Sequence, residues 1–448
     1  MSELPKAWTT STVGDLADSI QYGHTAKSSK MEVGPRFLRI TDIQDNNVDW
    51  SSVPFCPIPK NQIPKYRLDK GDLLFARTGA TVGKSFLIQT EIPESVFASY
   101  LIRVRVTKAI ESRYLYYFFQ SSDYWRQISD SSSGIGQPNV NGKKLAAIKL
   151  PIAPLPEQRR IVARIEELFS RLDAGVAALR HAKAQLQRYR QSVLAAAVTG
   201  QLTQAWREQQ PDTEPAEELL FNVLAERKAT WAGRGKYPLP LDVEDNLSQL
   251  PKGWVWTTLA HLANHIADGT HKTPTYVEAG IPFLSAKDVN GFKLSFGNCR
   301  YIPREEHEDL IKRCRPKPGN VLVTKNGTIG RIAVVKTEDE FSLFESVANV
   351  PVIAPLFSDF IAYAAHVGIA GAFGAKNKKG VAVRHLHLED LRRLPIPLPP
   401  LAEQPQIVAE AEARTTAIDH LEAELDRQIT RSNRLRQSTL SSAFQGEL

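Results

Sequence analysis

The sequence is poor in cysteine and has no long apolar run. Its 448 residues include three cysteines, Cys56, Cys299 and Cys314, whose scattered positions form neither a disulfide framework nor a zinc-binding pattern. No stretch of about 18 apolar residues occurs, which argues against a membrane-spanning helix. The first residues, Met-Ser-Glu-Leu-Pro, lack the basic region and apolar core of a secretory signal. We therefore expect a cytoplasmic protein with reduced thiols and no membrane partner.

Catalytic signatures are also missing. The segment GATVGKS (79–85) approaches a P-loop, but three residues separate its glycines where the motif has four, and the related GTIGRI (327–332) lacks the Lys-Ser pair. Both segments are better interpreted as a strand, a tight turn and a strand. His261 and His265 have helical spacing without the neighbouring Glu or Cys of a zinc site. Since no GxSxG motif or adenosylmethionine-type glycine turn occurs either, the sequence predicts no catalytic residue, no metal site and no cofactor of its own.

What the sequence does contain is an internal repeat. Shifted by 246 residues, residues 1–20 match 247–266 at nine positions, among them the pair Trp8 and Trp254. The segment 188–202 matches 434–448 at eight of fifteen positions. Matches of this kind from end to end indicate one structural unit used twice.

Each repeat has two parts with different patterns. The first part mixes short strand-like runs with Gly, Pro and Asn, and the second begins at a proline-rich corner followed by a long stretch suited to a helix. This division predicts an α+β protein with two mixed α/β domains, two long helices and a connector that holds a short helix. The expected boundaries are 1–152 for the first domain, 153–202 for the first helix, 203–247 for the connector, 248–396 for the second domain and 397–448 for the second helix.

The long stretches carry coiled-coil spacing. Apolar residues alternate at intervals of four and three over about five heptads of the first stretch, and a poorer seam follows in the second. We predict paired helices over 157–198 and 403–444, with a lone amphipathic helix on each domain as the alternative. The expected pairing residues are Ile161, Ile165, Leu168, Leu172, Leu179, Leu186, Ile407, Ile418, Leu421, Leu425 and Leu435.

Charge is distributed unevenly along the chain. The formal net charge is +7, but residues 1–152 and 248–396 each carry +5, whereas the two helical stretches carry +4 and −3. Helices of matched length and opposite charge are expected to pair with each other, here antiparallel about a pseudo-twofold axis. The basic charge is compatible with an acidic partner but does not require one.

Polar and basic residues recur at matching turns of the two repeats. Arg, Lys, Asn and Gln are the side chains that contact base edges and phosphates, although ordinary solvated loops have a similar composition. The two repeats keep the positions of these turns while changing their residues, which favours one scaffold that recognises two different DNA sequences. The candidate DNA-binding residues are His24, Lys27, Arg39, Thr41, Arg77, Thr78, Lys84, Gln137, Asn139 and Asn141 in the first repeat and His271, Lys272, Ser285, Lys287, Lys325, Asn326, Lys376, Lys378, Arg384 and His385 in the second.

Several motifs resemble one known family. The L-P-x-x-W starts at Leu4 and Leu250, the P-L-P-E-Q and P-L-A-E-Q corners at 154–158 and 400–404, and the R-Q-S-x-L helix ends are similar to the specificity subunit of type I restriction–modification systems. The similarity covers essentially the whole chain. It implies that each domain recognises one half of a bipartite target in double-stranded DNA, and that the helices set the spacer between the halves.

The resemblance also implies partners. A specificity subunit of this kind is not an enzyme; it recruits two adenine-N6 methyltransferase subunits through its helices, and two restriction translocase subunits join them. S-adenosylmethionine, ATP and Mg²⁺ would then be bound by those partners. The alternatives are a recognition subunit of a type IIB-like system and a coiled-coil scaffold with non-specific DNA-binding heads.

Overall fold

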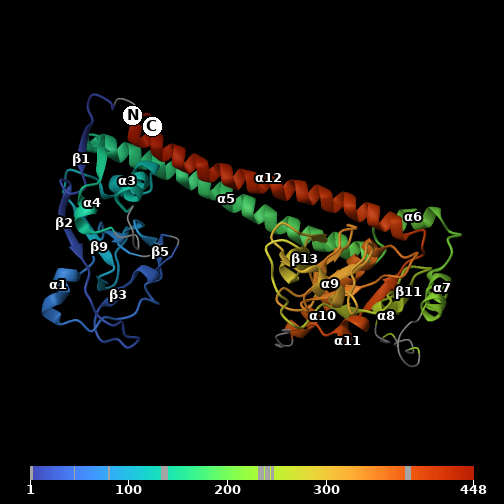
Figure 1. Ribbon diagram of the computed structural model, residues 1–448. Helices are drawn as coiled ribbons and strands as arrows, with labels where there is room; N and C mark the ends of the chain where they lie inside the picture. The colour runs from blue at the N-terminus through green and yellow to red at the C-terminus, as the bar shows by residue number, and fades with distance from the viewer. Residues whose placement is uncertain are drawn as a thin grey trace. The chain divides into compact units, whose positions relative to one another are not determined.

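The chain forms two compact units. The computed structural model describes residues 4–44, 46–78, 81–132, 140–230, 237, 243, 247–378 and 385–448, with the backbone alone at 131–132 and 373–378 (Figure 1). Unit 1 comprises residues 1–181 and 425–448, and unit 2 comprises residues 182–424. Each unit therefore contains one recognition domain together with parts of both long helices.

Unit 1 is built around a four-stranded antiparallel sheet. The order in this sheet is β2-β9-β6-β7, while β3 and β8 form a parallel pair and β1 and β10 an antiparallel one. The strands are β1 (Thr9–Thr12), β2 (Ala17–Tyr22), β3 (Arg36–Leu38), β4 (Ile43–Gln44), β5 (Asn47–Val48), β6 (Leu73–Ala76), β7 (Ser85–Leu87), β8 (Ser95–Phe97), β9 (Leu101–Val106) and β10 (Lys149–Ile152). The helices are α1 (Ile63–Tyr66), α2 (Ser112–Phe118), α3 (Ser122–Ser132), α4 (Gly142–Ala146) and α5 (Leu155–Val198), with short 3-10 turns at Ile40–Asp42 and Lys60–Gln62.

Unit 2 repeats this plan. Its four-stranded sheet has the order β12-β20-β17-β18, and β11 pairs with β21 as β1 pairs with β10. The strands are β11 (Val255–Thr258), β12 (Ala267–Asp268), β13 (Ile281–Leu284), β14 (Val289–Asn290), β15 (Lys293–Leu294), β16 (Arg300–Ile302), β17 (Val321–Thr324), β18 (Ile332–Val334), β19 (Ser342–Leu343), β20 (Val347–Val350) and β21 (Pro395–Leu398). The helices are α6 (Gln204–Gln209), α7 (Ala216–Ala229), α8 (Leu259–Leu262), α9 (Arg304–Leu310), α10 (Ser358–Lys378), α11 (Leu388–Arg392) and α12 (Gln404–Gln445), with a 3-10 turn at Ala286–Asp288.

The segments that approach a P-loop are hairpins. Strand β6 pairs antiparallel with β7, and β17 pairs antiparallel with β18, so a strand rather than a helix follows each glycine-containing turn. A P-loop requires a helix whose N-terminus faces the phosphates. The strand–turn–strand interpretation is therefore confirmed at both places.

The predicted long helices are confirmed as α5 and α12, whose ends differ from 157–198 and 403–444 by at most two residues. Within unit 1, Ile161 and Ile165 near the start of α5 share one core with Leu440 and Phe444 near the end of α12. Within unit 2, the end of α5 shares a core with the start of α12. The two helices consequently run antiparallel in each unit.

The buried seam of α12 differs from the predicted one. Leu421 and Leu435 are about half exposed, whereas Ile418 is buried. Two charged residues take part in the pairing instead. Arg436 stacks on the ring of Phe169 at 4.1 Å and bonds to Asp173 in unit 1, and Arg190 bonds to Asp419 (2.5 Å) and Glu422 (3.1 Å) in unit 2. These contacts place charged side chains between α5 and α12, where the heptad pattern predicted leucines. A charged side chain can lie there because it stacks on a ring or forms an ion pair with the other helix.

None of the helices in the described part of the chain combines the length and the apolarity needed to cross a membrane.

We expect Leu440→Ala to destabilise unit 1. Leu440 is fully buried, so truncation removes apolar contacts and leaves a cavity, at a cost of about 2–5 kcal/mol. Leu435→Ala, five residues earlier on the same helix, is the matched control and should change the free energy of unfolding by less than about 0.5 kcal/mol. Urea denaturation followed by circular dichroism measures both. Equal losses for the two variants would show that the end of α12 does not complete this core.

Candidate nucleic-acid interface

Some of the candidate residues of unit 1, among them His24 and Arg77, lie at one edge of the four-stranded sheet. Strands β2 and β6 end at this edge, and β7 and β9 begin there. The backbone N–H of His24 donates to Phe97 O (2.8 Å), and that of Arg77 donates to Tyr100 O (3.1 Å). These bonds fix the loops that carry His24 and Arg77 beside each other.

Arg77 has a particular setting at this edge. Its guanidinium lies 4.9 Å from the centre of the Tyr22 ring, and the Tyr22 hydroxyl accepts a hydrogen bond from Gly142 N (2.7 Å). The buried Nε of Arg77 has no hydrogen-bond partner in the structure. A cation held against a ring is suited to contact a polar group such as a base edge or a phosphate.

Sequence reasoning missed two aromatic residues here. Tyr22 and Tyr100 are 39% and 62% exposed, respectively, and both lie at this edge of the sheet. An exposed aromatic ring beside Arg77 adds a surface for stacking. The signal was present in the sequence as an aromatic residue at a strand end, a position where a polar residue is more common.

Other candidates of unit 1 have structural partners. Arg39 forms a bidentate ion pair with Asp42, at 2.6 Å and 3.0 Å, and the hydrogen bond from Arg39 raises the pKa of that guanidinium despite partial burial. Asn141 caps α4 by accepting a hydrogen bond from Lys144 N (2.9 Å). The candidates without an assigned structural role are exposed or half-buried: Lys27, Thr41, Thr78 and Lys84.

Unit 2 presents the same backbone with different side chains. Lys325 N donates to Ser346 O (2.8 Å), and Lys325 O accepts from Leu386 N (3.0 Å). Arg77 makes the matching bonds to Tyr100 O and from Val140 N. Lys325 is therefore the structural counterpart of Arg77, although simple alignment at 246 residues does not pair them.

Lys325 belongs to a buried charge cluster. Its ammonium pairs with Asp268, whose carboxylate also accepts from Arg313 (2.6 Å) and lies 3.3 Å from His271. The side chain of Asp268 is only 4% exposed. Burial alone would raise the pKa of Asp268, but the hydrogen bonds from Lys325 and Arg313 outweigh it and hold that pKa below its usual value.

The remaining described candidates of unit 2 divide into those that contact another side chain and those that are exposed. The side chains of Asn326 and His385 are brought together at 2.8 Å, while Ser285 forms a turn with Asp288 that matches the Arg39–Asp42 turn. His271, Lys272 and Lys287 are exposed. Five candidates lie outside what the structure describes, wholly or in their side chains: Gln137, Asn139, Lys376, Lys378 and Arg384.

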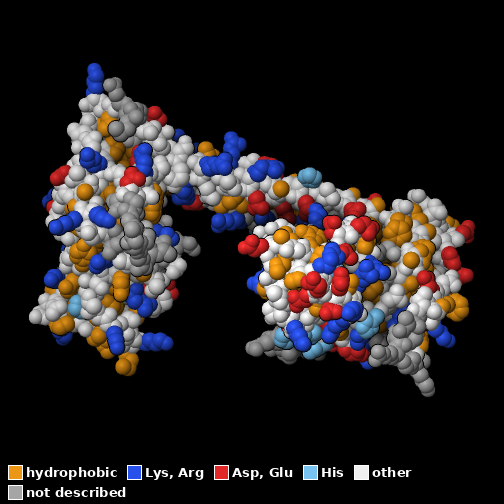
Figure 2. Space-filling view, viewed as in Figure 1, with side chains coloured by type: hydrophobic (Ala, Val, Ile, Leu, Met, Phe, Trp, Pro, Cys, Tyr) orange, Lys and Arg blue, Asp and Glu red, His pale blue; other side chains and the backbone are white. Residues whose placement is uncertain are grey.

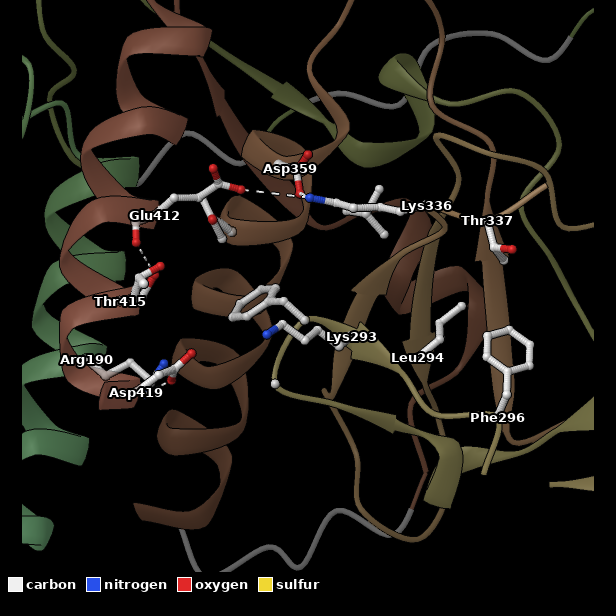
Figure 3. Close-up of a pocket in the computed structure, with 15 residues that line it drawn as sticks. Arg190, Lys293, Leu294, Phe296, Lys336, Thr337, Asp359, Glu412, Thr415 and Asp419 are labelled. Carbon is white, nitrogen blue, oxygen red and sulfur yellow. Dashed lines mark hydrogen bonds and ion pairs between the residues drawn. The ribbon is translucent and has the colours of Figure 1, made fainter. Parts of the chain in front are cut away.

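A hollow between α12 and strands β15 and β18 of unit 2 has a volume of about 620 Å³ (Figure 3). Five of its six charged groups pair with one another. Lys336 lies 3.1 Å from Asp359 and 3.8 Å from Glu412, and Arg190 bonds to Asp419. The Lys336–Glu412 pair connects the domain to α12, and the Arg190–Asp419 pair connects α5 to α12. We assign no ligand to the hollow.

The surface of each unit carries mixed charge. Figure 2 shows basic side chains spread over the viewed face of unit 1, and acidic and basic side chains interleaved on that of unit 2. Across the described residues, no three His, Cys, Asp or Glu side chains are placed so that they could hold a metal ion. One scaffold used twice, with different polar side chains at matching positions, defines a two-site recognition protein.

Comparison with known proteins agrees with this class. The family model for the type I restriction modification DNA specificity domain matches residues 5–179 and again 251–431. The chain belongs to this family, whose name assigns it a role in DNA specificity.

Two curated relatives and two solved structures illustrate the similarity. The chain is 28% identical to the type I restriction enzyme EcoBI specificity subunit of Escherichia coli, over 78% of this chain and 69% of that protein. It is 26% identical to the StySPI specificity subunit of Salmonella potsdam, over 100% of this chain and 90% of that protein. A chain from a study of the assembly and conformational transition of a type I restriction–modification system shares the fold, with a TM-score of 0.70, 19% identity and full coverage of both chains. The HsdS subunit from Thermoanaerobacter tengcongensis has a TM-score of 0.52, 19% identity and coverage of 100% and 98%.

We expect Asp268→Asn to lower the stability of unit 2 at pH 7. The substitution removes the charge that holds Lys325 and Arg313, at a cost of about 1–3 kcal/mol. Because the pKa of Asp268 is lowered in the folded state, the contribution of its charge is present above the unfolded pKa and is lost as pH falls through the folded pKa. The difference between wild type and variant should therefore shrink below about pH 4.

The control for this experiment is Asp309→Asn. Asp309 pairs with Lys312, but both side chains are about three-quarters exposed, so the loss should be clearly smaller than that for Asp268→Asn. Chemical denaturation across a pH series measures all three proteins. A stability difference for Asp268→Asn that does not vary with pH would contradict the assigned charge.

Proposed function

We propose that this chain is the DNA-recognition subunit of a type I restriction–modification enzyme, in which each unit recognises one half of a bipartite target. The observation that carries the proposal is the matched edge of the two sheets. The backbone hydrogen bonds are the same at this edge, while Arg77 beside Tyr22 in unit 1 is replaced by Lys325 beside Asp268 in unit 2. A constant backbone with changed donors and acceptors is what recognition of two different base sequences requires.

The proposed partners act through the helices. We propose that the chain assembles with two adenine-N6 methyltransferase subunits, and that two restriction translocase subunits join the complex. The family match and the likeness to a chain from a type I assembly support this assignment. Exposed apolar side chains on α5 and α12, namely Tyr189, Leu421 and Leu435, give these helices surface for protein contact. S-adenosylmethionine, ATP and Mg²⁺ belong to those partners in this proposal.

We further propose that the helices fix the length of the unread spacer. Helix α5 begins in unit 1 and ends in unit 2, and α12 does so in the opposite order. Helix α5 has 44 residues and is therefore about 66 Å long at 1.5 Å per residue. A paired helix of this length resists bending better than a single one, so the distance between the half-sites follows from the helices.

Arg77→Ala should relax recognition in one half of the target only. Loss of a bidentate base contact costs about 1–3 kcal/mol and weakens the preference at one base position. Mapping of methylated sites with the assembled methyltransferase measures the preference at each position. The matched control is Arg113→Ala, because Arg113 lies on α2 beside α5, where it pairs with Glu166 at 3.3 Å. An equal change in both halves, or uniform weakening with no change in preference, would refute the role of Arg77.

A heptad added to each helix should lengthen the spacer. A copy of residues 175–181 inserted after His181 and a copy of residues 418–424 inserted after Glu424 keep the seven-residue period and extend each helix by about 10 Å. At 3.4 Å per base pair this corresponds to about three additional base pairs. The added bases also rotate one half-site by about a third of a turn, so weaker binding is expected even at the best spacer.

The measurement is again the set of methylated sites. Insertion into α5 alone is the control, since it shifts one helix against the other and should abolish activity. If the doubly extended protein kept its original spacer with full activity, the helices would serve to dock partners and would not determine the distance.

A further inference from the structure

In both units, the strand that leads to the candidate edge ends in the same backbone setting. Gly23 follows Tyr22, the last residue of β2, and Gly269 follows Asp268, the last residue of β12. The N–H of each glycine donates to the first residue of the neighbouring strand, β9 or β20, at 3.2 Å and 3.3 Å. A Cβ atom at either glycine would lie 2.3 Å or 1.9 Å from a backbone oxygen, so a side chain would not fit there without a backbone shift. Tyr22 and Asp268 are therefore structural counterparts.

The residue at this strand end holds a cation in each unit. The Tyr22 ring faces the guanidinium of Arg77 at 4.9 Å. The two carboxylate oxygens of Asp268 bond to different cations, Oδ2 to Lys325 and Oδ1 to Arg313 at 2.6 Å. One position thus places a cation at the edge by ring stacking in unit 1 and by ion pairs in unit 2.

The two cations on Asp268 differ in exposure. The side chain of Lys325 is 11% exposed, whereas that of Arg313 is 58% exposed. Lys325 could reach DNA only by leaving the buried carboxylate, and separation of a buried ion pair is costly. Lys325 therefore serves to neutralise Asp268 from the protein side, and Arg313 is its partner on the solvent side.

Arg313 is also the group of this cluster that retains donors. A guanidinium has five N–H donors, and one of them bonds to Asp268. Among the described residues, the Arg313 side chain has no other hydrogen-bond acceptor. The nearby His271 is different, because its Nδ1 lies 2.7 Å from Glu345 and its Nε2 lies 3.3 Å from Asp268. Arg313 can consequently donate two parallel hydrogen bonds to a further group.

We propose that Arg313 is a specificity-determining residue of unit 2 that donates two hydrogen bonds to the major-groove edge of a guanine in the second half of the target. This inference rests on the proposed DNA recognition. Guanine is the base whose major-groove edge presents two acceptors, N7 and O6, which match the guanidinium fork. Asp268 is the positioning residue, since its buried carboxylate orients the guanidinium before DNA binds and so reduces the side-chain freedom lost on binding.

The charge around Arg313 favours a base edge over a phosphate. Apart from His271, the cluster contains the acidic Asp268 and Glu345 and the basic Lys325 and Arg313, whose formal charges offset one another. A phosphate is attracted by an excess of positive charge, which these four groups do not supply. A neutral base edge needs directed donors instead, and Arg313 has them.

The test is the sequence preference of the full chain assembled with its methyltransferase, measured by mapping methylated sites. Arg313→Ala should lower the preference for guanine at one position of one half at least about fivefold and leave the other half unchanged. Arg313→Lys keeps the charge and can still pair with Asp268, but it lacks the fork. It should relax the same position, while the salt dependence of binding to a duplex with the mapped target stays as in the wild type.

Arg304→Ala is the matched control. Arg304 belongs to the same unit, is 59% exposed and pairs with Glu340 at 3.0 Å, so it resembles Arg313 in exposure and pairing without lying on Asp268. Its loss should leave the preference at every position unchanged.

The positioning role of Asp268 has its own readout. Asp268→Asn should relax the same guanine position as Arg313→Ala, and the double variant should relax it no further than Arg313→Ala alone. A loss of folded protein would instead lower methylation at all sites without changing the preference at one base. Measurement at a temperature at which all variants remain folded separates the two effects.

Three results would overturn the inference. These are a second half-site without guanine, relaxation of the same position by Arg304→Ala, and uniformly weaker binding of Arg313→Ala with a smaller salt dependence, which would identify a phosphate contact. Failure of the proposed function is distinguishable, because the wild-type complex would then methylate no bipartite sequence and both proposals would fall. Failure of the inference alone would leave the bipartite target of the wild type and the effect of Arg77→Ala intact.

Discussion

Each recognition domain is closed by the end of a helix that belongs to the other repeat. Leu440 and Phe444 from the second repeat complete the core of unit 1, where the Phe444 ring meets Tyr114 and Phe118 with centroid distances of 5.0 Å and 5.3 Å. The end of α5 completes the core of unit 2 in the same way. Because neither repeat has a complete core without the other, the two long helices must both be present and antiparallel. The paired helices are thus a condition of folding as well as a connection between domains.

The residues that stabilise each domain are different from those proposed to contact DNA. The apolar contacts gather where the helices meet the sheets, whereas the candidate DNA-binding side chains lie at a sheet edge whose loops are fixed by backbone hydrogen bonds. A backbone bond does not depend on which side chain the residue carries. Side chains at that edge can therefore change between repeats while the scaffold stays the same.

Much of this arrangement could be predicted from the sequence, because repeats and long helical stretches leave periodic signals. The 246-residue shift located both copies, and the proline-rich corners located the starts of α5 and α12. Contacts between distant charged residues leave no such signal. The seam positions of Arg436 and Glu422 depend on partners on the other helix, and the burial of Lys325 depends on Asp268, 57 residues away. The related glycine motifs at 79–85 and 327–332 place Arg77 opposite Lys325, and the backbone bonds support this equivalence.

The surroundings of Arg77 and Lys325 indicate how easily each unit can change the DNA sequence that it recognises. Arg77 stacks on Tyr22 and leaves its buried Nε unused, so its replacement strands no buried charge. Lys325 is different because it neutralises Asp268, which is almost fully buried. Removal of one member of a buried pair leaves the other charge uncompensated, at a larger cost than loss of an exposed contact. Unit 1 can therefore exchange its central cation by a single substitution, whereas loss of the cation at position 325 leaves the buried Asp268 with Arg313 as its remaining strong partner and costs more stability. Divergence between the half-sites is accordingly less constrained in the first repeat than in the second.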